Sequence, residues 1–261
     1  MDMSLKGRRA VVCGSTQGIG RAAAIELAEL GATVTLLARD EGALRSAAAE
    51  LPAPQQQRHG FEIADFAEPE QVRAAAERIA RAGAVHILVN NTGGPPGGPI
   101  TDADPAAFER GFRMHIINNQ LLAQALIPGM KEAGFGRIIN IISTSVKAPI
   151  PGLGVSNTIR GAVASWAKTL AGELAPFGIT VNNVLPGFTD TARLASLFEA
   201  RAQRSGSTAD DEREQMRASI PAGRIGRPEE IAAAIAFLAS PAASYINGIN
   251  LPVDGGRLPT L

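Results

Sequence analysis

The sequence predicts an α/β domain built on a parallel sheet that helices cover on both faces. Short apolar runs of strand length alternate with longer amphipathic stretches, as they do in βαβ units. A glycine-rich turn joins the first strand-like run directly to the first helix-like run. With 261 residues, of which 45% are hydrophobic, the chain can bury one sizeable core. We therefore expect one doubly wound domain of about seven strands over residues 1–261.

The first unit is a strand, a turn and a helix. Residues 9–13 have the composition of a short buried strand, and residues 21–30 have that of a helix ending at Gly31. The three glycines of the turn between them let the backbone approach a pyrophosphate. The amides and the dipole at the helix N-terminus favour its negative charge. This unit predicts a dinucleotide-binding site.

The later elements continue the alternation to the end of the chain. The strand candidates are residues 11–12, 33–37, 86–90, 137–142, 180–184 and 250–253. The helix candidates lie near residues 21–30, 41–50, 69–82, 105–132, 154–175 and 228–239. We find no internal repeat and no low-complexity linker that would divide the chain.

Two segments interrupt this rhythm. Residues 92–99 are too rich in glycine and proline for a regular element, so they form a loop. Residues 190–218 are rich in charge and predict a mobile, partly helical excursion that covers a substrate site as a lid. Both segments follow strands, and ligands of open parallel sheets bind at the carboxyl ends of strands. We therefore expect both to border the pocket.

Composition narrows the classes of partner. Twenty-five basic residues balance twenty-five acidic ones, so no global charge favours nucleic acid or a membrane surface. The single cysteine excludes an intramolecular disulfide and suits a reducing compartment. The three histidines lack metal-ligand spacing, and no apolar stretch has the length of a signal or membrane segment. We expect a soluble cytoplasmic protein that acts on a small molecule without a metal ion.

Several motifs in order resemble those of the short-chain dehydrogenase/reductase family, over nearly the whole chain. Residues 13–20 are similar to its Thr-Gly-x-x-x-Gly-x-Gly loop, with Cys13 in the place of threonine. Residues 90–93 resemble its Asn-Asn-Ala-Gly, and residues 186–191 resemble its Pro-Gly-x-x-x-Thr. The resemblance implies a Rossmann-type fold, NAD(P)(H)-dependent oxidation and reduction, and a homotetramer or dimer. The general pattern is most similar to 3-oxoacyl-thioester reductases.

The resemblance also implies a set of cofactor contacts on the glycine loop, beside the sheet and around the nicotinamide. These residues are Gly14, Ser15, Thr16, Gln17, Gly18, Ile19, Gly20, Arg39, Asp65, Asn91, Gly93, Arg160, Pro186, Gly187, Thr189 and Thr191.

The end of the second strand distinguishes the two dinucleotides. An acid there would bind the adenosine ribose and repel a 2′-phosphate, but this chain has Ala38 followed by Arg39. A guanidinium suits a phosphate, and the hydroxyl of Ser15 is a further candidate donor. The alternative is that Arg39 pairs with Asp40 or Glu41 at a solvated helix start. We favour NADP(H) over NAD(H).

The catalytic positions depart from the family's pattern. Ser143 occupies the place of the family's serine, but Ser156 and Arg160 stand where the family has a Tyr-x-x-x-Lys pair. His115 stands in the place of an asparagine, and the only tyrosine of the chain, Tyr245, lies far along the sequence. A serine hydroxyl stabilises an oxyanion but is a poor proton source, and an arginine stays charged.

Three groups are candidates for the missing proton donor. His115 has a suitable intrinsic pKa and, by the resemblance, faces the pocket; otherwise it is a polar residue partly buried in a long helix. Lys147 lies four residues after Ser143 and is either an activating group or a solvated loop lysine. The third candidate is a water molecule held by Ser143 and Ser156.

Three functions remain open. The first is an NADP(H)-dependent oxidoreductase with a rearranged proton donor, which the intact cofactor motifs and the elaborate loops favour. The second is a catalytically silent nucleotide-binding sensor or partner subunit, which the missing Tyr/Lys pair favours. The third is a lyase or dehydratase on the same scaffold.

Overall fold

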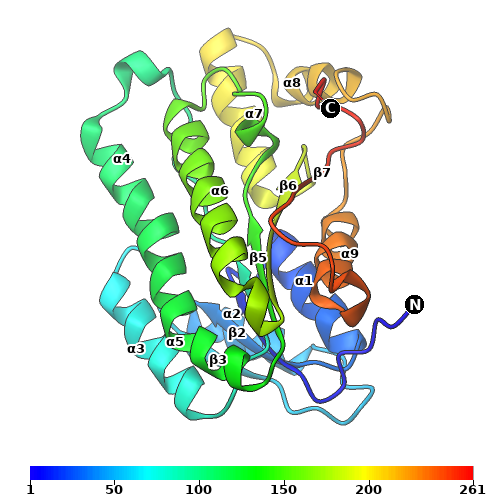
Figure 1. The fold of residues 1–261 in the computed structure, drawn as a ribbon. Helices are drawn as coiled ribbons and strands as arrows, with labels where there is room; N and C mark the ends of the chain where they lie inside the picture. Colours follow the sequence, from blue (N-terminus) through cyan, green and yellow to red (C-terminus); the bar gives the residue numbers. More distant parts are fainter. Residues whose placement is uncertain (261) are drawn as a thin grey trace.

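Seven parallel strands form the centre of the computed structural model, which describes residues 1–260 (Figure 1). Their order across the sheet is β3-β2-β1-β4-β5-β6-β7, and every neighbouring pair is parallel. The strands are β1 Arg9–Cys13, β2 Thr33–Ala38, β3 Gly60–Ile63, β4 Ile87–Asn90, β5 Gly136–Ile141, β6 Ile179–Pro186 and β7 Asn250–Val253. The predicted doubly wound, Rossmann-type fold is confirmed.

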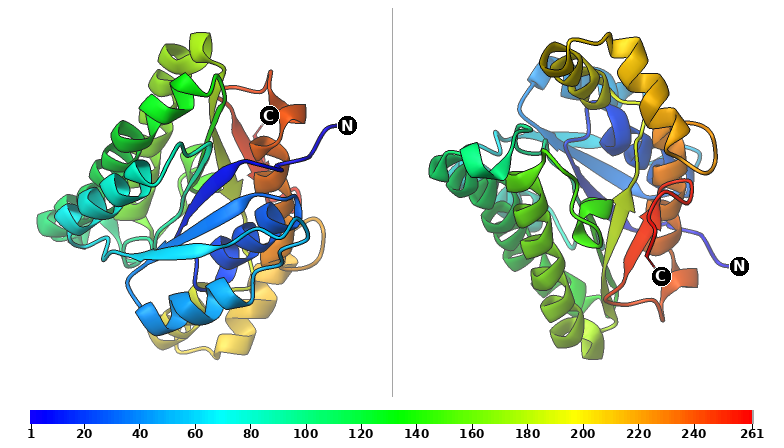
Figure 2. Two further views of the ribbon diagram at one scale, coloured as in Figure 1. Left: turned by 90° about the horizontal axis from the view of Figure 1, so that it is seen from below. Right: turned by 90° about the horizontal axis from the view of Figure 1, so that it is seen from above.

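Helices cover both faces of this sheet (Figure 2). They are α1 Gly18–Glu29, α2 Glu41–Ala49, α3 Pro69–Arg81, α4 Pro105–Phe112, α5 Asn118–Glu132, α6 Gly154–Leu174, α7 Ala192–Ser205, α8 Ala209–Ala218 and α9 Pro228–Ala239. One core cluster joins the sheet to α1, α2 and α9, and a second joins it to α3, α5 and α6. Because both faces are covered, β5 is buried throughout, including its two polar residues, Arg137 and Asn140.

Strand β3 is not among the runs that the sequence identified. It lies at the edge of the sheet and pairs only with β2. Its four residues, Gly60–Ile63, are half-buried or exposed, so selection for apolar side chains is weak there.

The helix expected over residues 105–132 is interrupted. A π-helical turn, Arg113–Ile117, separates α4 from α5. The periodicity of the side chains does not reveal such a turn, because it inserts a residue without breaking the rod. The turn carries His115 into the interior, where it is 2% exposed.

The segment over residues 190–218 is helical, as expected. It forms α7 and α8, which pack on each other around Leu194, Phe198 and Met216 near the carboxyl ends of the strands (Figure 1). Gly206 ends α7 with φ +72°, and Thr208 caps α8. The role of this segment as a lid stays a prediction.

A ladder of asparagines crosses the sheet beside the site. Asn90, Asn140, Asn183 and Asn250 are in register on β4, β5, β6 and β7. Each side-chain amide donates to the next side-chain carbonyl, at 2.8, 2.9 and 2.8 Å. The ladder fixes the register of the strands whose ends carry the site.

Within residues 1–260, no helix combines the length and the apolar character that crossing a membrane requires.

Candidate active site

The glycine loop is built for close approach of the backbone. It runs from the end of β1 to the start of α1, and Gly14 and Gly18 have φ of +57° and +55°. A Cβ atom on Gly20 would lie 2.1 Å from the carbonyl oxygen of Gly14, so no side chain fits there. The amide of Asn91 donates to that same oxygen at 3.2 Å and ties the loop to the end of β4.

A cavity of about 690 Å³ lies in front of this loop and the N-terminus of α1. Ten of the residues predicted to hold the cofactor line it: Gly14, Thr16, Gln17, Gly18, Ile19, Arg39, Asp65, Asn91, Gly93 and Thr191. The backbone cradle, the helix N-terminus and the size of the cavity fit a dinucleotide.

Ser15 corrects one expectation. Its side chain is fully buried, and its Oγ accepts a hydrogen bond from the backbone N–H of Leu37 at 3.1 Å. The hydroxyl therefore holds the loop against β2 and does not face the cavity. Thr16 and Gln17, the next residues of the loop, face the cavity instead.

Arg39 is exposed at the rim of this cavity, directly after β2. The two acids that offered an alternative partner have other roles. Asp40 accepts from the backbone N–H of Ala43 at 2.9 Å, and Glu41 pairs with Arg45 at 2.7 Å. Among residues 1–260, the Arg39 guanidinium has no hydrogen bond or ion pair, so it is free to meet an anion.

A second cavity of about 200 Å³ adjoins the first, and Thr92, Thr191 and Arg193 line both. It brings together most of the predicted catalytic and nicotinamide-side residues: Ser143, Ser156, Arg160, Pro186, Gly187 and Thr189. Lys147 is not among them, because it is exposed and follows a short 3₁₀ turn, Thr144–Val146, beyond Ser143.

Ser143, Ser156 and Arg160 present hydrogen-bond donors to the second cavity. The Oγ of Ser143 accepts from the backbone N–H of Ser145 at 3.1 Å, which leaves its own proton available. Ser156 and Arg160 lie one turn apart on α6, on the same face, and each is 8% exposed. Arg160 is held in place by donating to the carbonyl oxygen of Ile141 at 2.9 Å.

Arg160 remains a cation at neutral pH. Burial, and secondly the positive charge of Arg193, lower its pKa to about 10. Its charge is therefore available to a developing oxyanion.

His115 lies behind this site and not in it. It lines neither large cavity but a space of about 10 Å³ beside Asn140 and Arg160. Burial lowers its pKa to about 2; the charges of Arg160 and Arg193 add to this effect, and a hydrogen bond to the backbone of Gly93 opposes it. The expectation that His115 faces the pocket as an acid is wrong, because the ring is neutral and enclosed at neutral pH.

Two arginines at the site were not expected from the sequence. Arg193 donates from both terminal nitrogens, to the carbonyl oxygens of Gly94 at 3.0 Å and Pro95 at 3.1 Å. It thereby ties α7 to the loop over residues 92–99. Arg257 reaches the second cavity from the segment after β7. Arg193 could have been predicted, because it lies two residues after Thr191, a predicted cofactor contact. No motif next to Arg257 predicts that it reaches the cavity.

Comparison with known proteins agrees with this geometry. A family model described as enoyl-(acyl carrier protein) reductase matches residues 14–257. The 3-oxoacyl-(acyl-carrier-protein) reductase FabG of Vibrio harveyi is 36% identical, over 97% of this chain and 98% of its own length. Cis-4-hydroxycyclohexanecarboxylate dehydrogenase of Sinomonas cyclohexanicum is also 36% identical, over 98% of both chains.

Solved structures are similar over the full length. L-sorbose reductase from Gluconobacter frateurii, complexed with NADPH and L-sorbose, superposes with a TM-score of 0.93. The two chains are 32% identical, and the match covers 100% of each. These comparisons cover the glycine loop, the sheet and both cavities together.

Proposed function

The chain belongs to the short-chain dehydrogenase/reductase family, and on that basis we propose that it is an NADP(H)-dependent oxidoreductase. It reduces a carbonyl group or oxidises the matching alcohol in the second cavity. The observation that carries this proposal is the convergence of Ser143, Ser156 and Arg160 in a cavity that adjoins the dinucleotide cavity.

Different residues of the first cavity bind different parts of the cofactor. The glycine loop and the start of α1 take the pyrophosphate, and Arg39 takes the 2′-phosphate of the adenosine ribose. Asp65 lines the same cavity, and the family resemblance assigns it to the adenine. Bound NADPH supplies a hydride for the carbonyl carbon.

The second cavity stabilises the oxygen that becomes negative. The hydroxyls of Ser143 and Ser156 and the guanidinium of Arg160 donate hydrogen bonds toward the substrate oxygen. Because Arg160 is buried and fixed by Ile141, its charge needs no reorganisation during the reaction.

The proton for this oxygen comes from a water molecule held by Ser143 and Ser156. Of the three candidates, Lys147 is exposed away from the cavity and His115 is enclosed behind it. The charge of Arg160 lowers the pKa of such a water, so that the water protonates the alkoxide, and it stabilises the hydroxide that remains until the hydroxide exchanges with solvent. In most members of the family the tyrosine donates this proton. Here the two serines position a water molecule that donates it.

The alternatives differ in what they require of this cavity. A lyase or dehydratase needs a base to abstract a proton, yet within residues 1–260 no carboxylate, histidine, lysine or tyrosine lines the second cavity. A silent sensor needs no set of converging donors there. Both observations favour the oxidoreductase.

Fluorescence titration with NADPH and NADH, followed by a panel of ketones and 3-oxoacyl thioesters, tests the proposal. We expect tighter binding of NADPH and measurable oxidation. Ser156→Ala lowers kcat about 100-fold and leaves the Kd for NADPH unchanged, because it removes a donor to the oxyanion. Ser165→Ala, an exposed serine on the same helix, is the matched control. Binding of NADPH without turnover of any carbonyl would favour the silent sensor instead.

A further inference from the structure

The second cavity is strongly cationic. Three of the residues that line it are arginines, Arg160, Arg193 and Arg257. No acidic residue lines it, and no ion pair within residues 1–260 involves any of the three. Arg160 is buried, Arg257 is half-buried and Arg193 is exposed, and the one acid that acts electrostatically on Arg257, Asp254, lies outside the cavity lining. The cavity is therefore electrostatically complementary to an anion.

Arg160 and Arg193 repel each other across the loop. A Cβ atom on Gly94 would lie 2.8 Å from Nη2 of Arg193 and 3.2 Å from Nη2 of Arg160, so the two guanidinium groups are neighbours. Arg193 also lines the first cavity, and its two terminal nitrogens already donate to the carbonyl oxygens of Gly94 and Pro95. Of the two cavities, Arg160 and Arg257 line only the second.

Arg257 is the arginine with unused hydrogen-bonding capacity. Its Nε is buried and has no partner among the described residues, while its guanidinium carbon lies 4.4 Å from the centre of the Phe188 ring. The nearby acid, Asp254, accepts from the backbone N–H groups of Gly256 at 3.0 Å and Leu258 at 2.7 Å. Its oxygens therefore shape the C-terminal turn, and the aromatic ring holds the guanidinium in a fixed plane.

Part of the remaining wall is aliphatic. Ile150, Leu153, Leu194 and Leu197 line the same cavity of about 200 Å³. This volume is below the range typical of drug-sized ligands, about 300–1,000 Å³. It suits a short hydrocarbon chain between a carbonyl group and an anionic group.

We propose that the substrate is a small oxo acid, or the corresponding hydroxy acid, whose carboxylate is bound by Arg257 while its carbonyl oxygen lies beside Ser156 and Arg160. This inference rests on the proposed function for the reacting group. A planar guanidinium binds a carboxylate through two parallel hydrogen bonds, which a neutral ester or thioester does not offer.

Matched pairs of substrates test the charge requirement. Acetoacetate, 4-oxopentanoate and 5-oxohexanoate are each compared with the methyl ester, using NADPH oxidation. We expect at least one acid to exceed its ester about 10- to 100-fold in kcat/KM, the range of a charge-assisted bond. Dihydroxyacetone phosphate is included because a guanidinium also binds phosphate. A preference for the phosphate or for the neutral esters would overturn the proposal.

Variants of Arg257 test whether this residue causes the preference for the acid. Arg257→Gln should lower kcat/KM for the acid about 10- to 100-fold more than for the ester, and Arg257→Lys should restore the preference for the acid in part. Arg204→Gln, an exposed arginine on α7, is the control and should change neither. An unchanged acid-to-ester ratio in Arg257→Gln would contradict the assignment of Arg257.

Binding of unreactive probes separates this inference from the proposed function. Calorimetry with pentanoate and pentanamide, on the protein loaded with NADPH, needs no catalysis. Selective binding of pentanoate that Arg257→Gln abolishes would support the anion site even if no carbonyl were reduced. Equal or absent binding of both probes, with active reduction of neutral ketones, would overturn the inference and leave the oxidoreductase intact.

Discussion

We expect Arg39 to determine the choice between the two dinucleotides. It is exposed at the cavity rim, without an ion pair among residues 1–260, and it follows Ala38 where an acid would favour NADH. We expect Arg39→Ala to weaken NADPH binding by about 1.5–3 kcal/mol and to leave NADH binding unchanged. Fluorescence titration of both cofactors measures the difference.

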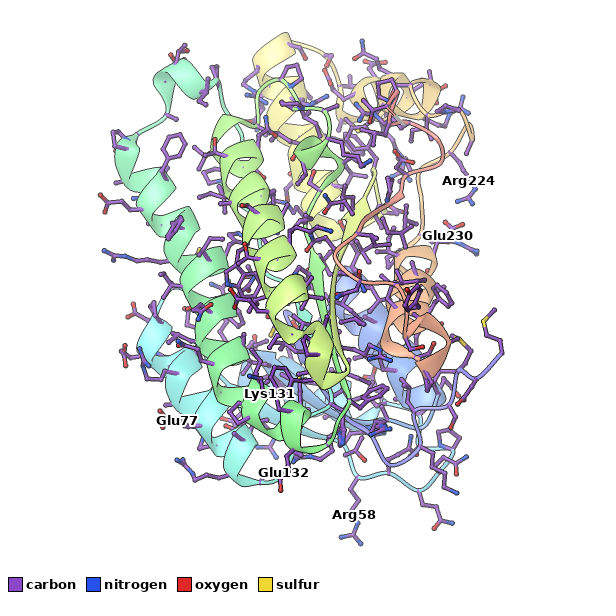
Figure 3. All side chains as sticks on the ribbon, in the orientation of Figure 1. Arg58, Glu77, Lys131, Glu132, Arg224 and Glu230 are labelled. Carbon is purple, nitrogen blue, oxygen red and sulfur yellow. The ribbon has the colours of Figure 1, made fainter. Side chains whose placement is uncertain are left out.

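A control for that substitution is Arg58→Ala. Arg58 is an exposed arginine that projects into solvent far from α7 and α8 (Figure 3). If Arg39→Ala weakened the binding of NADPH and NADH equally, Arg39 would not recognise the 2′-phosphate.

His115 makes the stability of the fold depend on pH. Burial lowers its pKa to about 2, whereas the pKa of histidine in an unfolded chain is about 6.5. Below the unfolded value the unfolded chain binds a proton that the folded chain does not. The free energy of unfolding therefore decreases as the pH is lowered below about 6.5, by up to about 1.4 kcal/mol per pH unit for this group.

His115→Asn removes this dependence. Urea denaturation of both proteins at about pH 7 and about pH 5 should show a smaller loss of stability for the variant. Parallel losses in the two proteins would show that His115 is not enclosed as a neutral ring.

Individual site residues were predictable where a backbone motif places them. The glycine loop, Asn91 and Thr191 follow strand ends, and the structure brings them to one cavity. Ser15 was misassigned because a sequence does not tell which way a loop hydroxyl points, and here it points to Leu37. Arg257 was missed because only the tertiary packing of the C-terminal segment brings it to the cavity.

At the scale of elements, the asparagine ladder holds the strands that carry the site. Asn140 both donates and accepts in the middle of the ladder, so its removal leaves two buried polar partners unpaired. We expect Asn140→Ala to lower the free energy of unfolding by at least about 2 kcal/mol. Urea denaturation measures this loss, and Ser165→Ala should stay within about 0.5 kcal/mol of the parent protein. A loss no larger than that of Ser165→Ala would show that the ladder adds no stability.

Helices and strands were predictable where their burial produces a regular pattern of apolar residues in the sequence. The alternation of apolar runs identified every strand except β3, since both faces of the sheet are covered. It failed at β3, a half-exposed edge strand, and at the π-helical turn Arg113–Ile117. Such a turn is stabilised by its surroundings and leaves no mark in a 3.6-residue pattern.

At the scale of the whole molecule, we expect cofactor binding to stabilise the fold. The dinucleotide cavity is formed by the glycine loop, the end of β2, the end of β4 and α7, which only the folded chain brings together. NADPH at about 100 times its Kd should therefore raise the free energy of unfolding by about 2.7 kcal/mol. Thermal denaturation with equal concentrations of NADPH and NADH measures this, and Arg39→Ala should abolish the advantage of NADPH. An equal rise with both cofactors in the parent protein would contradict the preference.

We propose that this site transfers a hydride without the family's tyrosine. The most direct test uses NADPH deuterated at the transferred C4 position, with the panel of oxo acids and neutral ketones, and mass spectrometry of the products. We expect one deuterium on the carbinol carbon of an alcohol product, and about 100-fold less of it with Ser156→Ala. Tight binding of NADPH with no deuterium in any product would contradict the claim and identify the protein as a nucleotide-binding member of the family without catalysis.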